Sequence, residues 1–164
     1  TELNKLGSGV TKTLDHYKEI KMAGMTKEKA MEMYHGGLDC SQVTFGHGLE
    51  LMGMDPEFGY KAGACFGGGL FQGKTCGCVT GSLMAIGMKY GHYKMNDAEA
   101  KEEMMKMKAE FEEAFIAEHG TLMCNELLGM KIPEDMDKIM QEGLLDKICP
   151  VLAVTACNIL DELL

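Results

Sequence analysis

Residues 96–120 read NDAEAKEEMMKMKAEFEEAFIAEHG, and the fold class follows from this stretch. Its larger apolar residues recur at intervals of three or four, which is the period of one face of an α-helix. They include Met104, Met107, Phe111 and Phe115. Asn96 is a suitable N-terminal cap and Gly120 a suitable end. The sequence therefore predicts a long charged helix between these two residues.

Start and stop signals predict further helices on both sides of this stretch. Thr26 and Gly36-Gly37 bound one, Asp39 begins another that reaches Met52, and Asp55-Pro56 begins a third. The remaining helices run from Cys76 or Gly77 through Met88, from Pro133 to Leu144 and from Asp146 to Leu163. No segment shows the period-2 alternation of a strand. We predict an all-α, compact single-domain helical bundle of about five to seven helices over residues 1–164, with the weakest pattern in 1–24.

The bulk composition limits the classes of function. A chain of 164 residues with 46% hydrophobic residues can bury one core without disulfides. Its net charge of −9 argues against a nucleic-acid partner, because nucleic-acid binders replace counterions with clustered Lys and Arg. No stretch approaches the roughly 18 to 20 apolar residues of a membrane span, and residues 1–5 lack the apolar region of a signal peptide. We expect a cytoplasmic protein without a membrane span.

Seven cysteines are many for a chain of this length, and their odd number prevents complete internal disulfide pairing. In a reducing compartment, several thiols in one small domain indicate metal binding or redox chemistry. All seven are candidate cofactor and metal ligands. They are Cys40, Cys65, Cys76, Cys78, Cys124, Cys149 and Cys157.

The densest group lies in a glycine-rich loop between residues 63 and 81, which holds Cys65, Cys76 and Cys78. A loop that enters a helix offers free N–H groups and the positive end of the helix dipole, and both lower the pKa of a thiol. Glycines let the backbone come close to a bound group. Cys40, directly after Asp39, is expected at a similar helix start.

The other three cysteines lie in the C-terminal third of the chain. Cys149 and Cys157 are eight residues apart. On a continuous helix they would be separated by about 12 Å, so they cannot both bind one iron atom. Either the site holds an extended or double cluster, or one of the two thiols is structural.

Residues 76–91, CGCVTGSLMAIGMKYG, resemble the signature of the redox-active protein family C_GCAxxG_C_C. Related segments occur in split-Soret cytochromes, where they are associated with an iron–sulfur centre. The resemblance extends from about Gly36 to the C-terminal helix. It implies that the family's four cysteines correspond to Cys40, Cys76, Cys124 and Cys149.

The sequence departs from this family pattern at three thiols. Cys78 replaces the usual alanine, and Cys65 and Cys157 are additional. These departures suggest a larger or unusual cluster, or a cluster beside a reactive dithiol.

Residues 68–75, GGLFQGKT, also satisfy the phosphate-loop pattern of nucleotide hydrolases. That motif requires a hydrophobic strand before it, and residues 63–67 read GACFG instead. No parallel-sheet pattern follows it either. We therefore favour the explanation that these glycines serve a thiolate site.

These patterns predict an iron–sulfur protein, with a 4Fe-4S or a larger, unusual cluster, that transfers electrons or reduces a small molecule. Its partner would be a redox protein or a small-molecule substrate. Whether it is an oxidoreductase, and whether it is a homodimer, both stay open. One alternative is a metal-free thiol–disulfide protein that uses Cys76 and Cys78, and another is a thiolate module for zinc or copper.

Overall fold

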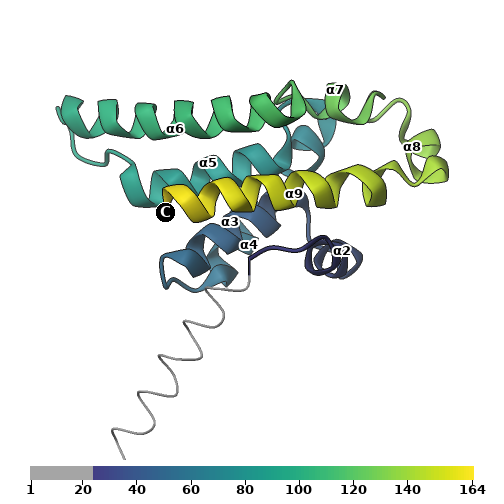
Figure 1. Ribbon diagram of the computed structural model, residues 1–164, viewed down its shortest axis with the longest axis horizontal. Helices are drawn as coiled ribbons and strands as arrows, with labels where there is room; N and C mark the ends of the chain where they lie inside the picture. Colours follow the sequence, from purple (N-terminus) through teal and green to yellow (C-terminus); the bar gives the residue numbers. More distant parts are fainter. Residues whose placement is uncertain (1–23) are drawn as a thin grey trace, which may run out of the picture.

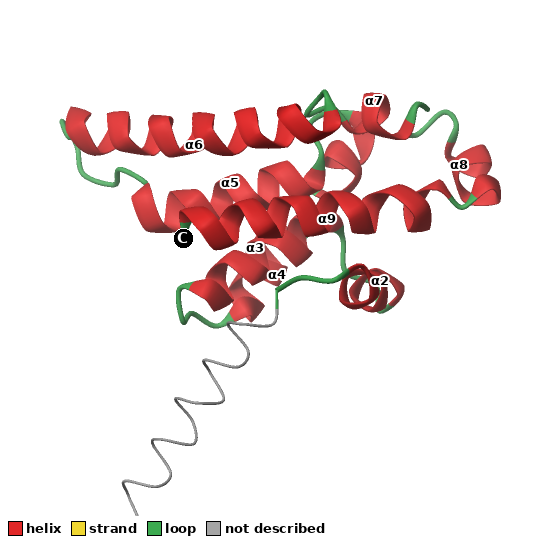
Figure 2. Cartoon of the chain, in the orientation of Figure 1, coloured by secondary structure: helices red, strands yellow, loops and turns green. Residues whose placement is uncertain are grey.

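The computed structural model describes residues 24–164, and every element in that range is helical (Figures 1 and 2). The helices in chain order are α2 (Lys27–His35), α3 (Cys40–Leu51), α4 (Pro56–Gly63), a π-helical turn η1 (Gly69–Gly73), α5 (Gly77–Tyr90), α6 (Ala98–His119), α7 (Cys124–Leu128), α8 (Met136–Glu142) and α9 (Leu144–Leu163). The described chain has no strand, only an isolated bridge between Thr75 and Met123. The all-α prediction is confirmed.

The expected five to seven helices were too few, since residues 24–164 contain nine. The two missed elements are η1 and α7, each of five residues. A helix this short completes little more than one turn, so its apolar residues cannot reveal a period. The weak pattern predicted for residues 1–24 lies almost wholly outside the described residues.

Two predicted helix starts are confirmed by their caps, whereas the last two helices begin at Met136 and Leu144 and not at Pro133 and Asp146. The Thr26 hydroxyl accepts a hydrogen bond from the Lys29 N–H at 3.1 Å, and the Asp55 carboxylate accepts one from the Glu57 N–H at 3.0 Å. The predicted cap of the long helix was wrong by one residue. Asp97, not Asn96, caps α6, because its carboxylate accepts from the Ala100 N–H at 3.1 Å.

The main core lies where α3, α5 and α9 pack together, with α6 on one side and α2 on the other (Figure 1). Its largest fully buried side chains include Leu49, Ile86, Phe111, Phe115 and Leu160. Burial of each such side chain stabilises the fold by about 1.5 to 3 kcal/mol. A smaller core joins α7 and α8 to the start of α9 through Leu128, Ile132 and Ile139.

Two glycines of α5 allow it to pack directly on α3. A side chain on Gly81 would clash with the Ser41 carbonyl oxygen and the Thr44 hydroxyl, and a Cβ on Gly77 would lie 3.0 Å from the Cβ of Cys40. The two helices therefore touch at backbone distance. This close contact brings the start of α5 beside the start of α3, where Cys76 and Cys40 lie.

None of the helices within residues 24–164 combines the length and the apolar character that crossing a membrane requires.

Candidate functional site

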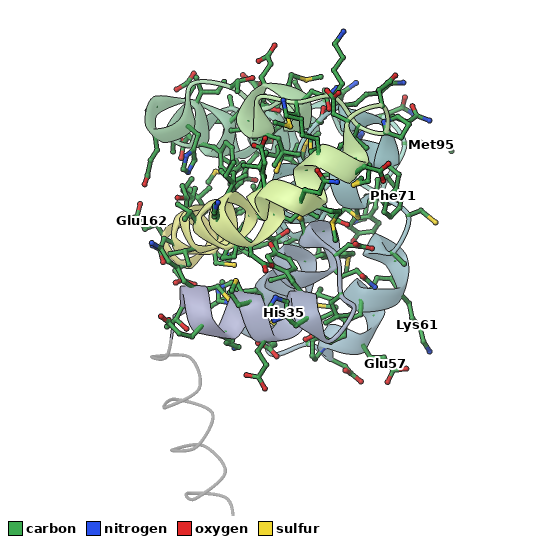
Figure 3. All side chains as sticks on the ribbon, turned by 90° about the vertical axis from the view of Figure 1, so that its right-hand side faces the viewer. His35, Glu57, Lys61, Phe71, Met95 and Glu162 are labelled. Carbon is green, nitrogen blue, oxygen red and sulfur yellow. The ribbon has the colours of Figure 1, made fainter. Side chains whose placement is uncertain are left out.

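A cavity of about 390 Å³ lies at the end of the molecule where α2, α7 and α8 meet the start of α9. Figure 3 views the molecule from this end and labels His35 and Phe71, which both belong to the cavity wall. Four thiols line the cavity, namely those of Cys40, Cys76, Cys124 and Cys149. Most of the remaining wall is apolar, and it includes Leu38, Leu127, Ile132, Met136 and Leu145.

Two of these cysteines stand at the starts of long helices. Cys40 is the first residue of α3, which has 12 residues, and Cys76 is the N-cap of α5, which has 14. Free N–H groups and the positive end of the helix dipole are concentrated at such positions. The cavity therefore lies in a region that favours negatively charged sulfur.

Cys76 and Cys124 are held side by side by backbone hydrogen bonds. The Cys76 N–H donates to the Leu122 carbonyl at 2.8 Å, and the Cys124 N–H donates to the Lys74 carbonyl at 2.6 Å. These bonds flank the antiparallel bridge between Thr75 and Met123. A Cβ on Gly69 would approach the Cβ of Cys124 to 2.9 Å, so a glycine is required there.

Cys149 lines the cavity from α9, and a tyrosine of α2 forms a hydrogen bond with its backbone. The Tyr34 hydroxyl lies 3.4 Å from the Cys149 carbonyl oxygen, to which it donates. The same hydroxyl lies 3.7 Å from the Cys78 sulfur. Sequence reasoning missed Tyr34, because nothing in its local pattern distinguishes it from a core residue of α2.

The thiols of the cavity share charge unequally. The neighbouring thiols of Cys149 and Cys78 hold the pKa of Cys40 well below its usual value, although burial opposes this shift. The hydrogen bond to Cys40, together with burial, raises the pKa of Cys149. Burial, together with the nearby Cys76 and Cys40, raises the pKa of Cys124 to about 12. Cys40 therefore loses its proton more readily than Cys124 or Cys149 does.

Cys78 belongs to the same group of thiols but stands behind the cavity. Its side chain is fully buried, and it is not part of the cavity wall. Hydrogen bonds to Cys40 and Cys76, followed by burial, raise its pKa well above the usual value. Cys78 is therefore a neighbour of two cavity thiols.

The remaining two candidates lie elsewhere. Cys65 is exposed just after α4, and Cys157 is buried in the main core. Burial and the nearby Asp161 raise the pKa of Cys157. Of the two thiols separated by eight residues on α9, only Cys149 lines the cavity.

Among residues 24–164, no three His, Cys, Asp or Glu side chains converge closely enough to hold a single metal ion. The four thiols instead surround a space. The phosphate-loop interpretation also lacks its structural context, since the residues before Gly68 do not form a strand and η1 follows directly.

An apolar cavity lined by four cysteines, two of them at the starts of long helices, defines an all-helical, cysteine-rich protein. The chain matches the family model described as "Putative redox-active protein (C_GCAxxG_C_C)" over residues 38–163, more than half of its length, and it belongs to that family. The matched range contains all four cavity cysteines. Comparisons with curated proteins and with solved structures find no significant match.

Proposed function

We propose that the cavity binds an iron–sulfur cluster through Cys40, Cys76, Cys124 and Cys149, and that the bound cluster transfers electrons or reduces a small molecule. One observation carries this proposal: four thiols from four separate helical segments line the same cavity. Four cysteine thiolates are the usual ligand set of a [4Fe–4S] cluster.

The chemistry of the cavity suits such a group. A volume of about 390 Å³ falls within the range of about 300 to 1,000 Å³ typical of cofactor sites. Four thiols distributed around a cavity suit a [4Fe–4S] cluster, which has four irons, better than they suit one zinc or copper ion. The starts of α3 and α5 add hydrogen-bond donors and positive potential for an anionic cluster.

The bound cluster would supply one-electron redox chemistry, and the protein would set its environment. Cys40 is more ready to bind than Cys124 or Cys149, because the pKa of its thiol is lowered. Cys124 and Cys149 must lose protons that burial and their neighbours help to retain. Cluster binding should therefore release protons.

A second candidate function rests on the contact between Cys78 and its neighbour Cys76 at the start of α5. In this function the two thiols form a sulfur–sulfur bond and lose two protons and two electrons. A low-molecular-weight disulfide would accept them and become two thiols. This function would need no metal.

The deciding experiment is anaerobic purification and cluster reconstitution, with iron and acid-labile sulfide measured on one sample and a visible spectrum taken before and after dithionite. We expect equal molar amounts of iron and sulfide, and a visible absorption band that dithionite bleaches.

Alanine substitution of Cys40, Cys76, Cys124 or Cys149 should remove most of the iron while helical content, measured by circular dichroism, is retained. Cys65→Ala and Cys157→Ala are matched controls, and both variants should retain their iron.

Full iron retention by Cys76→Ala would contradict the proposed ligand set. A reconstituted protein without iron or sulfide would favour the dithiol function. Bound zinc or copper instead of iron would favour a module that binds those metals.

A further inference from the structure

Four residues of the cavity wall are also exposed to solvent, and they mark the mouth of the cavity. His35 and Asp146 form its polar part, with Nε2 of His35 3.1 Å from a carboxylate oxygen of Asp146. Phe71 and Met140 form its apolar part and are 50% and 62% exposed. Figure 3 looks onto this end of the molecule and labels His35 and Phe71. A molecule that enters from solvent therefore passes one polar pair and two apolar side chains.

Phe71 lies in the turn η1, whose backbone conformation is unusual. Leu70 and Phe71 both have a positive φ, of 62° and 53°, although neither is a glycine. Bulky residues rarely adopt this left-handed conformation, and they keep it only where surrounding contacts hold them. The position of Phe71 is therefore imposed by its surroundings.

Contacts on both sides of the turn hold it against the cavity. The Lys74 carbonyl oxygen accepts a hydrogen bond from the Cys124 N–H at 2.6 Å. A Cβ on Gly73 would overlap the side chain of Asn125, whose carbonyl oxygen accepts from the Ile132 N–H at 2.8 Å. The turn is therefore fixed to α7 and to the segment that carries Ile132.

The ring of Phe71 continues the cavity wall outward to solvent. An added Cβ on Gly68 would lie 3.6 Å from the Cδ1 of Phe71 and 3.9 Å from the Cδ1 of Ile132. Gly68 and Ile132 both belong to the cavity wall. Leu70, the neighbour of Phe71 in the same backbone conformation, does not.

We propose that Phe71 is a specificity-determining residue: its ring, fixed at the mouth of the cavity by η1, limits by size the molecules that reach the cavity thiols. The wall is largely apolar, and its charged groups include Asp39 and Asp146. The site should therefore select small, uncharged molecules. That these molecules are the reactants of a bound cluster rests on the proposed function.

The test uses the reduced, metal-free full-length chain in a Cys65→Ser background, which removes the exposed thiol. Each protein is treated with N-ethylmaleimide and, separately, with N-(1-pyrenyl)maleimide. These reagents carry the same reactive group, are uncharged and differ in width. Peptide mass spectrometry of a time course gives the two rates at each cavity cysteine. Their ratio at one cysteine, compared between variants, cancels the reactivity of that thiol and reports access.

The variants are Phe71→Ala, Phe71→Tyr and Leu70→Ala. Leu70→Ala is the matched control, because Leu70 shares the left-handed conformation and is 39% exposed but lies outside the cavity wall. Phe71→Tyr keeps an aromatic ring of the same width. Cys157, fully buried in the main core, is an internal control for unfolding, since it reacts only when that core opens.

In the parent protein, N-ethylmaleimide should modify the cavity cysteines faster than the pyrenyl reagent does. Phe71→Ala should raise the rate of the pyrenyl reagent by about tenfold, because this reagent no longer has to displace the ring from its rotamer. The rate of N-ethylmaleimide should change little. Phe71→Tyr and Leu70→Ala should keep the ratio of the parent protein.

An unchanged ratio in Phe71→Ala, or an equal change in Leu70→Ala, would overturn the role of Phe71. A faster pyrenyl reaction accompanied by equal modification of Cys157 would also overturn it, because the cause would then be unfolding. These rates are measured without a metal. A protein that takes up no iron but shows the expected ratios would therefore refute the proposed function and still support the size limit at Phe71.

Discussion

At the scale of single residues, the two thiols on α9 illustrate how position decides chemistry. Cys149 lines the cavity, whereas Cys157 is fully buried in the main core. Burial and Asp161 raise the pKa of Cys157, so this thiol stays protonated in the folded protein at pH values where it ionises in the unfolded chain. Its effect on stability should therefore depend on pH.

The free energy of unfolding should fall as the pH rises above about 8.5, the usual pKa of cysteine, because the unfolded chain then loses a proton that folded Cys157 keeps. One such thiol contributes a slope of up to about 1.4 kcal/mol per pH unit. In Cys157→Ala this contribution is absent, so the free energy of unfolding of this variant should fall less steeply as the pH rises. Urea unfolding of the metal-free protein from pH 6 to 10 measures both slopes.

Below pH 7.5 the two stability curves should run parallel, since the thiol is protonated in both states, and this range serves as an internal control. An equally steep alkaline decline in Cys157→Ala would contradict the assignment of that slope to Cys157.

A second prediction at this scale concerns Cys40, whose pKa is lowered by its thiol neighbours. At pH 7 in the metal-free protein, iodoacetamide should modify Cys40 before Cys124 and Cys149, because the thiolate is the reactive form. Peptide mass spectrometry of a time course, in a Cys65→Ser background that removes the exposed thiol, measures the order. Equal rates at the three cysteines would contradict the unequal sharing of charge.

At the scale of elements, the contact between α3 and α5 builds the site. Gly81 sits against the Ser41 carbonyl and the Thr44 hydroxyl, whereas Gly87, six residues further along the same helix, would have no atom within 4 Å of an added Cβ. The two glycines form a matched pair for testing whether close packing positions the cysteines.

Gly81→Ala should force α5 away from α3 and destabilise the protein by about 1 to 3 kcal/mol, the usual cost of overpacking. It should also reduce iron uptake, because it separates Cys40 from Cys76. Gly87→Ala should be neutral or should stabilise by about 0.5 to 1 kcal/mol through helix propensity. Chemical unfolding and iron analysis check both; equal behaviour of the two variants would disprove the packing argument.

At the scale of the whole molecule, charge should govern electron exchange if the proposed function holds. The chain has a net charge of −9, and the cavity wall contains Asp39 and Asp146 but no Lys or Arg. Anionic reactants should therefore be repelled and cationic ones attracted.

Salt screens these interactions, with a Debye length of about 10 Å at 0.1 M. Oxidation of the dithionite-reduced protein by anionic ferricyanide should become faster as salt is added, and oxidation by a cationic cobalt ammine complex should become slower. Stopped-flow absorbance measures both rates. A change in the same direction for both oxidants would show that charge does not control access.

Much of this molecule could be predicted from the chain alone, because many helix signals are local. Thr26 and Asp55 cap their helices through bonds to residues two or three positions away, and the three- to four-residue period of α6 is visible without any neighbour. The cysteine content likewise pointed to thiolate chemistry, and the family resemblance singled out the four cysteines that line the cavity.

Only the tertiary structure decided where each thiol lies and which residues surround it. The separation of Cys149 from Cys157 depends on how α9 packs, and the position of Cys78 behind the cavity depends on the close approach of α5 to α3. The contacts of Tyr34 join residues that are 44 and 115 positions apart in the chain. Local patterns report the preferences of a segment, whereas burial, hydrogen bonding and shared charge among thiols arise only when distant segments meet.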